Sequence, residues 1–580
     1  MVKNKKVFFF FIVIFTALIY FLWLFKTYLG NHHSAYYSLW DYNLGYFNFE
    51  NDYFIQNTNQ FKISIIWPIF KVLKINFNND IQGFIIHFAF STINGLFVYK
   101  ILEKNFLIKS VYEKIAILLS LLTIGTMLIG GNVSSWITGY NAVPTYFTYT
   151  LMIVFVYCFL NFKNQILLFI LSSLLILSQL RVAWFPIGIC CFYSIFLEKD
   201  KSKLFWILGV IISLLYLFQL TDQISSKEEK IIIFKNVLAH SRFEADFNLQ
   251  KYYKQIFLII SFIINFYILK FFKKKNILKN EFIMFLQTVL FISIFVYSFA
   301  KFYTYKGYLI YPFPELLAIS FTRALGLYQL FFWILLAKYI SILKCNIHLK
   351  YIFFIGIFYV PSTFWRNLDL EPKYFIGLFI FSIILLTYFL LNNFFKKKYF
   401  QKEILALLIF LILLLPGVSY LTFQNLKKFN FYSFGILSKW TLPQFINEDE
   451  KLLSLVKLRQ CDDFILYDYQ KLWISSAVAG KSQYVGHRGY NHFNLELAKV
   501  HLNRKKIHED LMDNIINKTQ INNSIIKDLK KDNVFVLTNK KDIKIFEKIE
   551  KFQISKNYFI VFFSDNQYKI NNFKKSCQIR

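Results

Sequence analysis

The segment that decides the topology of this chain is Gln165–Leu197, which reads QILLFILSSLLILSQLRVAWFPIGICCFYSIFL. It is apolar nearly throughout, and its single charged residue is Arg181. As one continuous helix, at about 1.5 Å per residue, it would be about 50 Å long, whereas the hydrocarbon core of a bilayer is about 30 Å thick. We therefore predict two membrane spans, 165–180 and 182–197, on either side of Arg181. One span broken at Arg181 is the alternative, and it would move every later loop to the opposite side of the membrane.

Apolar runs of this kind recur along most of the chain. Of the 580 residues, 56% are hydrophobic, 21% are aromatic and 17% are charged. This composition excludes an ordinary soluble enzyme, a disordered chain and a coiled coil. Starting with residues 7–29, we predict about thirteen spans, which together form an all-α polytopic membrane domain. The spans after the first are 81–102, 115–131, 144–161, 165–180, 182–197, 204–220, 255–271, 282–301, 326–343, 350–364, 374–393 and 403–421.

The distribution of Lys and Arg predicts which loops face the cytoplasm. The formal net charge is +32, which in a soluble protein would suggest a nucleic-acid partner. Here the loops assigned to the cytoplasm, beginning with Met1–Lys6, hold 20 basic residues, and the short loops on the other side hold 5. This is the asymmetry of the positive-inside rule, so we expect membrane lipids and no nucleic acid as partners. The N-terminus is then cytoplasmic, and an odd number of spans places the C-terminal tail outside the cytoplasm.

We expect two domains. Residues 1–424 form the membrane domain, with long outer loops at 30–80 and 221–254, and residues 425–580 form an extracytoplasmic α/β domain. Within the first of these loops, Ile63–Ile75 is apolar but too short to cross a bilayer, so we predict an interfacial helix there.

The tail alternates strand-like and helical patterns. The predicted strands are Phe464–Tyr467, Gln483–Val485, Val534–Leu537 and Tyr558–Phe563, and helical patterns lie around Asn494–Asn503 and Ile543–Lys551. Cys461 and Cys577 lie near the two ends of the tail. They allow one disulfide if the tail faces an oxidising compartment.

Acidic residues in the first long outer loop are the candidates for catalysis. Asp41, Glu50 and Asp52 lie among aromatic residues that include Tyr53 and Trp67. A carboxylate between aromatic walls suits a general base, because partial desolvation tunes its pKa and aromatic rings hold a sugar. The alternative is a solvated loop in which Asp and Asn residues form turns.

Arginine is informative because this chain uses Lys far more often. Arg181, Arg242 and Arg323 all fall on the predicted outer side, and Lys306 shares a loop with Arg323. An arginine side chain binds phosphate through a rigid fork of donors, and a lipid-linked donor presents phosphate at the membrane surface. Alternatively, each Arg extends to lipid headgroups or pairs with a nearby carboxylate such as Glu315.

In the tail, the stretch Leu472–Asn494 contains a polar cluster made of His487, Arg488, Asn491 and His492. These residues follow a predicted strand and are candidates for a polar surface that covers the membrane site. The two histidines are five positions apart, which does not match a pair of metal ligands on a helix.

The order of these elements resembles the GT-C superfamily of membrane glycosyltransferases. The shared layout is a cytoplasmic N-terminus, a first span, a long outer loop with acidic residues, about a dozen further spans and an external α/β domain. The tail is also similar to that of bacterial GT-C-like proteins, in which a strand is followed by a spaced set of residues. In this chain the set is Trp473, Ala477, Gly480, Lys481, Tyr484, Gly486, His487 and Asn491.

The resemblance implies a mechanism. A polyprenyl-phosphate-linked sugar is the donor, and a cell-surface glycan or glycolipid on the periplasmic face of a bacterial inner membrane is the acceptor. Members carry an essential acid in the first outer loop, which points to Asp52 first and Asp41 second. The adjacent acidic pair of some members is absent, since Glu50 and Asp52 flank Asn51.

Further roles follow from the same resemblance. Attack and departure on opposite faces of the sugar would invert the anomeric carbon. The groups expected to bind the leaving phosphate are Arg323, Arg181, Lys306 and Arg242. The groups expected to bind the sugar or acceptor are Tyr53, Trp67, His487, Arg488 and Asn491. Some relatives use a divalent cation and others do not, so the cofactor stays open and no metal ligands are assigned.

Two other functions share some of these features. A polysaccharide polymerase or ligase also has many spans and outer arginines, but it usually places its long loop late and lacks an external α/β tail. A transporter should show ionisable residues within its spans and repeated broken helices, and the sequence shows neither pattern.

Overall fold

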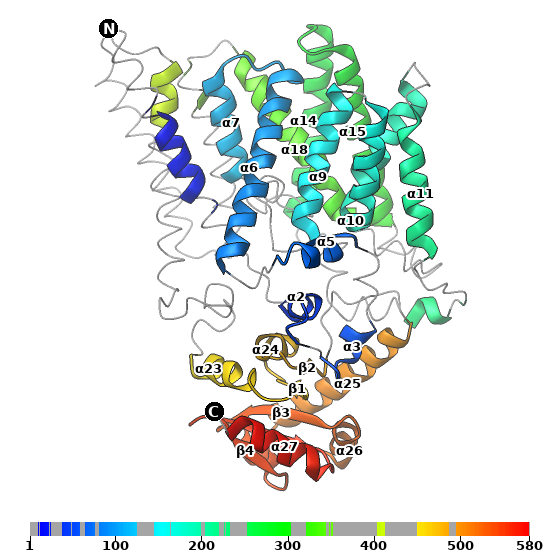
Figure 1. Cartoon of the computed structure of the whole chain (residues 1–580). Helices are drawn as coiled ribbons and strands as arrows, with labels where there is room; N and C mark the ends of the chain where they lie inside the picture. Colours follow the sequence, from blue (N-terminus) through cyan, green and yellow to red (C-terminus); the bar gives the residue numbers. More distant parts are fainter. Residues whose placement is uncertain are drawn as a thin grey trace.

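A computed structural model of the chain describes residues 10, 12–22, 24, 37–47, 49–57, 64–75, 80–123, 144–162, 164–198, 204–219, 226, 228–232, 252–302, 321–343, 347, 350–351, 403–411, 449–485 and 495–578. They form a helical bundle and a smaller α/β domain, with short helices from residues 30–80 between the two (Figure 1). Residues 30–80 are called the first outer loop below, and the described residues 449–578 are called the C-terminal domain.

The bundle consists of long helices that are apolar on all sides, as expected for helices that contact either lipid or other helices. Most of them coincide with predicted spans. Their bounds are Asp80–Lys104 (α6), Val111–Thr123 (α7), Pro144–Asn161 (α9), Gln165–Phe192 (α10), Tyr193–Leu197 (the π-helical η2), Trp206–Gln219 (α11), Tyr252–Lys274 (α14), Asn280–Phe302 (α15) and Phe321–Ile342 (α18).

By length and composition, three helical stretches among the described residues can cross a membrane, namely Gln82–Lys104, Asn280–Phe302 and Leu325–Ile342. Shorter apolar helices coincide with further predicted spans, and they are Ile12–Leu22, Phe147–Asn161, Gln165–Leu180, Val182–Leu197 and Trp206–Gln219. The predicted spans 350–364, 374–393 and 403–421 lie wholly or partly outside the described residues. The described part is therefore a polytopic helical bundle, whereas the predicted number of spans stays a prediction.

Helix α10 breaks two residues before the predicted position. Gln179 has extended backbone angles, with φ −163° and ψ 99°. A helix that ends leaves its last carbonyls without intrahelical partners. The first outer loop supplies donors, since Ile65 N donates to Leu177 O at 3.0 Å and Ser64 Oγ donates to Ser178 O at 2.6 Å. The break therefore lies at the end of the bundle that faces the first outer loop.

The opposite end of the bundle brings several helix termini together. A cavity of about 110 Å³ there is lined by Lys104, Gln165, Glu198, Trp206 and Lys279, among others. Because the start of α10 and the end of η2 meet at this cavity, the two halves of residues 165–197 run antiparallel, as predicted. Lys338 Nζ also donates to Leu107 O at 3.0 Å, which joins the loop after α6 to α18.

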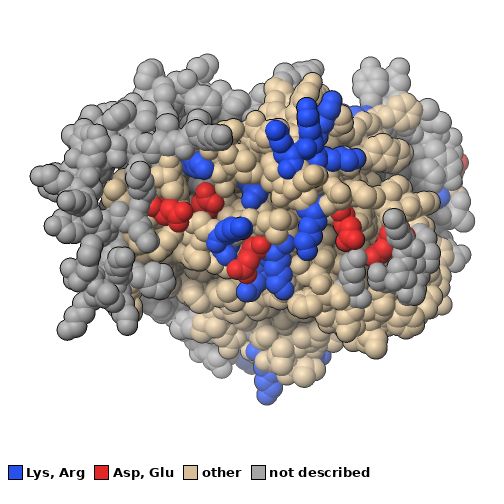
Figure 2. All heavy atoms as spheres, turned by 90° about the horizontal axis from the view of Figure 1, so that it is seen from above, with Lys and Arg blue, Asp and Glu red and all other residues tan. Residues whose placement is uncertain are grey.

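Basic residues gather on this end. Figure 2 views the face of the bundle opposite the C-terminal domain, and Lys and Arg side chains cluster there, interspersed with Asp and Glu. Lys104, Glu198 and Lys279, which belong to three of the predicted cytoplasmic loops, line the same cavity at this end of the bundle. This arrangement is the spatial counterpart of the loop asymmetry in the sequence.

The C-terminal domain contains a five-stranded mixed sheet with the order β2-β1-β3-β5-β4. Strands β1 and β2 pair in parallel, as do β1 and β3, whereas β5 is antiparallel to both β3 and β4. Separate apolar clusters cover the two faces of the sheet. The strands are Ile465–Tyr467 (β1), Ser482–Gln483 (β2), Val534–Asn539 (β3), Lys551–Gln553 (β4) and Tyr558–Phe563 (β5).

Most of the predicted tail elements are present. The helices are Asp449–Leu458 (α23), Trp473–Ala479 (α24), Leu495–Ile516 (α25), Asn523–Lys531 (α26) and Gln567–Gln578 (α27). The predicted helix at Ile543–Lys551 is wrong for its second half. A short 3-10 helix covers Ile543–Phe546, where Phe546 packs against the sheet, and β4 follows because Lys551 pairs with Val561 at the sheet edge.

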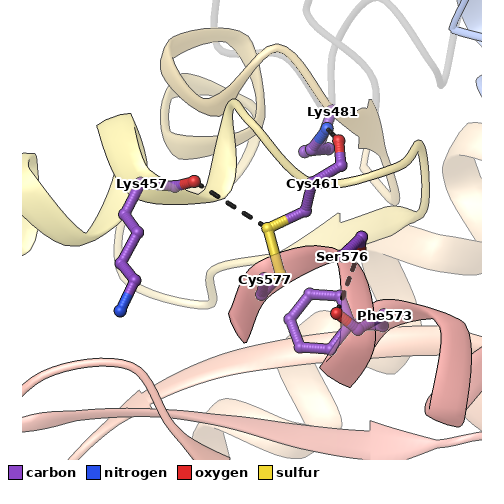
Figure 3. Close-up of a disulfide and its surroundings, with 6 residues drawn as sticks. All are labelled: Lys457, Cys461, Lys481, Phe573, Ser576 and Cys577. Atoms are coloured by element: carbon purple, nitrogen blue, oxygen red, sulfur yellow. Dashed lines mark hydrogen bonds between the residues drawn. A yellow bond between two sulfur atoms is a disulfide. The ribbon is translucent and has the colours of Figure 1, made fainter. Parts of the chain in front are cut away.

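A disulfide links Cys461 to Cys577, with a Cα–Cα distance of 5.2 Å (Figure 3). It joins the segment before β1 to α27, which lies near the end of the chain. Lys481 Nζ donates to the carbonyl oxygen of Cys461, and burial lowers the pKa of Lys481 to about 8. The pairing left open from the sequence is therefore made within the C-terminal domain.

Candidate active site

The first outer loop lies between the bundle and the C-terminal domain (Figure 1). Its helices are Tyr37–Asn43 (α2), Tyr53–Gln56 (α3) and Ile66–Val72 (α5). Their apolar side chains form one buried cluster with a residue of α25, and the members are Leu39, Trp40, Phe49, Phe54, Ile55, Ile66, Trp67, Phe70 and Leu497. Ile86 and Phe90 of α6 pack against the same cluster. The loop therefore holds the C-terminal domain against the bundle.

Asp52 lies at the contact between the first outer loop and strand β2. It caps helix α3, where its Oδ1 accepts from Phe54 N and Ile55 N, both at 2.9 Å. Its Oδ2 accepts from Gln483 N at 2.9 Å, across 431 positions of sequence. Only 1% of Asp52 is exposed. Burial raises the pKa of Asp52 to about 7, against the opposing effect of the Gln483 N–H, so this carboxyl exchanges a proton near neutrality.

Asp41 forms an ion pair with the C-terminal domain. Arg459 Nη2 lies 2.6 Å from Asp41 Oδ2, and the Asp41 side chain is fully buried. The same guanidinium donates to Val478 O at 3.2 Å and lies 4.5 Å from the centre of the Phe47 ring. Asp41 is thus a charged group held by a charged partner, which distinguishes it from Asp52.

Asn51 forms a third polar link between the same two parts. Its backbone N and its Nδ2 each donate to Asp463 Oδ2 at 3.1 Å. Asp463 also accepts from Ser482 N at 3.0 Å and from Ser482 Oγ at 2.7 Å. Ser482 and Gln483 are consecutive in β2, so neighbouring residues of one strand bind Asp463 and Asp52.

Gln483 also contributes a side-chain donor at this contact. The residue is 3% exposed, and its Nε2 has no hydrogen-bond partner among the described residues. A buried donor without a partner is costly, so such a group in a native structure calls for an explanation. A hydroxyl bound next to Asp52 would supply the missing acceptor.

The remaining candidates in the first outer loop have different surroundings. Glu50 is exposed in the turn before α3, and Tyr53 is half-buried at the start of α3. Trp67 is 1% exposed, and its ring centre lies 4.6 Å from that of Trp40. Trp67 therefore packs inside the loop and does not present an open face to a sugar in this arrangement.

The predicted phosphate-binding residues are described only in part. Arg181 lies on α10 two positions after the break, and Arg323 lies in the first turn of α18. The side chains of these two arginines are outside the described part of the chain. The predicted residues that lie wholly outside it are Lys306, Arg242, His487, Arg488 and Asn491.

Two arginines at the interface were missed from the sequence. Arg459 binds Asp41, and Arg504 of α25 donates through Nη1 to Tyr484 O at 2.9 Å and pairs with Asp532 at 3.1 Å. The scarcity of Arg that pointed to Arg181 applies equally to these two residues. That signal could have found them, but neither lies in a loop between predicted spans.

Two residues of the spaced set in the tail that supports the family resemblance, Gly480 and Tyr484, have a structural role. Gly480 has φ +61°, and a Cβ built on it would lie 3.0 Å from the Phe47 ring. Tyr484 is buried under Arg504, whose guanidinium carbon lies 4.8 Å from its ring centre. These residues therefore shape the surface on which the first outer loop packs.

A metal site is not evident among the residues that the structure describes. No three His, Cys, Asp or Glu side chains gather there into a group that could hold an ion. His501 lies in the interface with its ring 6.0 Å from that of Phe54, and burial lowers the pKa of His501 to about 3. Its ring is therefore neutral at physiological pH.

Comparisons of this chain with known proteins and solved structures gave the following results. No protein-family model and no curated protein matches the chain. Among solved structures, it is similar to the crystal structure of ArnT from Cupriavidus metallidurans bound to undecaprenyl phosphate, with a TM-score of 0.47 and 10% identity over 96% of this chain and 98% of that chain. A likeness at this level does not specify substrates or catalytic residues.

Proposed function

We propose that this protein is an integral-membrane glycosyltransferase of the GT-C type. It transfers a sugar from a polyprenyl-phosphate-linked donor to a cell-surface glycan or glycolipid. The reaction takes place where the first outer loop meets the C-terminal domain, next to one end of the bundle. The observation that carries the proposal is Asp52, a buried carboxyl at this contact whose pKa is raised to about 7 by its surroundings.

The orientation we propose is an inner-membrane protein with a cytoplasmic N-terminus and a periplasmic C-terminal domain. The clustered Lys and Arg on the far end of the bundle support a cytoplasmic position for that end (Figure 2). The Cys461–Cys577 disulfide supports an oxidising compartment for the C-terminal domain. Both features favour a site on the periplasmic side, where a lipid-linked donor and a growing surface glycan would meet.

In the proposed mechanism, Asp52 takes the proton from the acceptor hydroxyl as that oxygen attacks the anomeric carbon of the donor sugar. A base whose pKa lies near the working pH is deprotonated in a large fraction of molecules and still accepts a proton readily. In the resting arrangement Asp52 Oδ2 accepts one hydrogen bond, from Gln483 N, and its second lone pair is available to the acceptor hydroxyl. The unpartnered Nε2 of Gln483 would then donate to the incoming hydroxyl.

The other bond change is at the leaving group. The bond between the anomeric carbon and the phosphate oxygen breaks, and the charge that develops on the lipid phosphate needs cationic partners. We assign this role to Arg323 and Arg181, which begin or interrupt helices of the bundle, with Lys306 and Arg242 as further candidates. In-line displacement in one step would invert the anomeric carbon.

The test compares Asp52→Asn with Asp41→Asn and Glu50→Gln in cells and in lipid nanodiscs. We expect Asp52→Asn to lower transfer by about a hundredfold or more, because general-base catalysis contributes roughly that factor. Mass spectrometry of the extracted glycolipid should then lack one defined sugar mass. Glu50→Gln serves as the matched control, since Glu50 is exposed in the same loop and should keep wild-type activity.

Asp41→Asn separates a catalytic carboxylate from a structural one. Asp41 pairs with Arg459, so Asp41→Asn removes this ion pair and should lower thermal stability. Activity should fall only because fewer molecules are folded, and the activity of each folded molecule should stay the same. An Asp52→Asn protein that is folded and fully active would exclude Asp52 as the base. A glycan that changes on gene deletion but in none of these variants would exclude the mechanism as a whole.

A further inference from the structure

A second cavity lies in the C-terminal domain beside the first outer loop. Its volume is about 280 Å³, close to the lower end of the range of about 300–1,000 Å³ for small-molecule sites. The residues that line it are Asn51, Asp462, Asp463, Phe464, Ile465, Asp532, Asn533, Phe535, Lys569, Asn572 and Phe573. Only Asn51 comes from the first outer loop, so the cavity is completed when the loop packs against the domain.

The polar lining combines acceptors and donors that the protein does not use. No hydrogen bond or ion pair joins the side chains of Asp462, Lys569 or Asn572 to other described residues. By contrast, Asp463 is occupied by Asn51 and Ser482, and Asp532 is occupied by Arg504. Asp462 and Lys569 are exposed and Asn572 is half-buried, so a carboxylate, an ammonium and an amide in the lining are open to solvent and to a ligand.

This set of groups selects a class of ligand. Carboxylate and amide groups bind the hydroxyls of a sugar, because each hydroxyl is both a donor and an acceptor. Phosphate is disfavoured, since the three Asp residues of the lining outnumber Lys569, its one cationic side chain. The lining therefore fits a neutral or amino sugar better than the phosphate end of a lipid-linked donor.

The cavity is also connected to the proposed base. Asn51 precedes Asp52 in the chain, and Asp463, which binds Asn51, is among the groups that raise the pKa of Asp52. We infer that this cavity holds a sugar residue of the acceptor glycan while the reacting hydroxyl lies at Asp52. The role of the bound sugar as acceptor rests on the proposed function, whereas the binding of a sugar in this cavity does not.

Binding is tested without any donor, using the full-length protein in nanodiscs. The probes are lactose, chitobiose, N,N′-diacetylchitobiose and glucose 6-phosphate, with binding followed by saturation-transfer NMR. We expect the neutral or amino disaccharides to bind, and Asp462→Ala and Asn572→Ala each to weaken binding about tenfold, as the loss of one hydrogen bond to a charged or amide group does. Asp510→Ala is the matched control, because Asp510 is an exposed carboxylate on α25 outside the cavity.

The outcomes separate this inference from the proposed function. The cavity is not a sugar site if none of the disaccharides binds, or if glucose 6-phosphate binds most tightly. The same conclusion follows if Asp462→Ala and Asn572→Ala bind the disaccharides as tightly as wild type does. Asp52→Asn should keep wild-type binding while losing transfer. In a transfer assay, the cavity variants should raise the KM for the acceptor about tenfold with kcat unchanged. Wild-type protein that binds sugar but transfers none would overturn the glycosyltransferase proposal and the acceptor role, and leave only a glycan-binding cavity.

Discussion

At the scale of single residues, Asp52 and Asp41 show how one loop places two carboxylates in different surroundings. Asp52 accepts three backbone N–H bonds and has no cationic side chain among its hydrogen-bond partners. Asp41 is paired with Arg459 at 2.6 Å. A buried carboxylate without a cation is costly to ionise, and this cost raises the pKa of Asp52, whereas Asp41 has the Arg459 guanidinium as its partner.

The raised pKa of Asp52 predicts a pH dependence of stability. In the folded protein the pKa is about 7, compared with 3.8 for an ordinary Asp, so the folded state retains a proton that the unfolded state releases between these values. Asp52 therefore contributes roughly 4 kcal/mol to the free energy of unfolding. This contribution is fully present below about pH 4 and is lost as the pH rises through about 7. The side chain of Asn does not titrate, so Asp52→Asn should remove this part of the pH dependence of stability.

The measurement is the difference in Tm between wild type and Asp52→Asn at about pH 5 and pH 8 in detergent micelles. His501 acts in the opposite direction, because its pKa is lowered to about 3 in the folded protein, but it is present in both proteins and cancels in the difference. Glu50→Gln should follow the wild-type profile. A constant Tm difference between wild type and Asp52→Asn would contradict the prediction.

Replacement of Gly480 by alanine should destabilise the protein, and the same replacement at Gly45 is the control. Both have positive φ, +61° and +76°, so alanine at either position costs about 1–2 kcal/mol from the backbone alone. A Cβ at Gly480 would also meet the Phe47 ring at 3.0 Å, whereas nothing lies within 4 Å of one at Gly45. Gly480→Ala should therefore lower the Tm more than Gly45→Ala. Equal losses would mean that the contact with Phe47 is easily relieved.

At the scale of elements, the close approach of α10 and α11 depends on a residue without a side chain. A Cβ on Gly209 would lie 2.7 Å from Ser173 Oγ and 2.8 Å from the backbone oxygen of Phe169. Trp206, one turn earlier, is fully buried and packs against Phe155 with ring centres 5.6 Å apart. Small residues allow helices in membranes to approach closely, so Gly209 fixes where α11 lies against the bundle.

We expect Gly209→Ala to destabilise the bundle by about 1–3 kcal/mol, because the backbone of α10 must shift to admit the methyl group. Gly188→Ala is the matched control on α10, since nothing lies within 4 Å of a Cβ built there. Thermal unfolding in micelles compares the two variants. A Gly209→Ala protein as stable as Gly188→Ala would show that α11 is not tightly packed at this point.

At the scale of the whole molecule, a disulfide links the last described helix to a segment that contacts the first outer loop. The Cys461–Cys577 disulfide spans 116 positions and holds α27 beside the segment that carries Arg459. That same segment contacts the first outer loop through Arg459 and Asp463. The fold of the C-terminal domain and its contact with the bundle are therefore coupled.

Reduction of this disulfide should destabilise the C-terminal domain by roughly 3–5 kcal/mol, from the loop-closure entropy of a loop of this length. The test uses a variant that retains only Cys461 and Cys577, in cells whose outer membrane is permeabilised and whose inner membrane is intact. This variant should react with a membrane-impermeant maleimide only after the disulfide is reduced. Reaction before reduction would show free thiols. Reaction that requires disruption of the inner membrane would place the C-terminal domain on the cytoplasmic side and contradict the proposed orientation.

Much of the layout follows from local patterns in the sequence. The apolar runs at 81–102 and 282–301 coincide with α6 and α15, and the run Tyr558–Phe563 coincides with β5. Hydropathy and residue spacing depend on near neighbours in the chain, so they report spans, strands and the balance of charge between loops. The break in residues 165–197 was predicted for the same reason, because length alone forbids a single span.

The site required contacts that no local pattern encodes. Asp52 binds Gln483 across 431 positions and Arg459 binds Asp41 across 418 positions. The sequence marked the acids of the first outer loop as candidates but could not pair them, because partner choice depends on how the loop packs between the bundle and the sheet. Burial creates the difference between the two acids, since removal from water raises the cost of charge on Asp52 while the Arg459 guanidinium offsets it for Asp41.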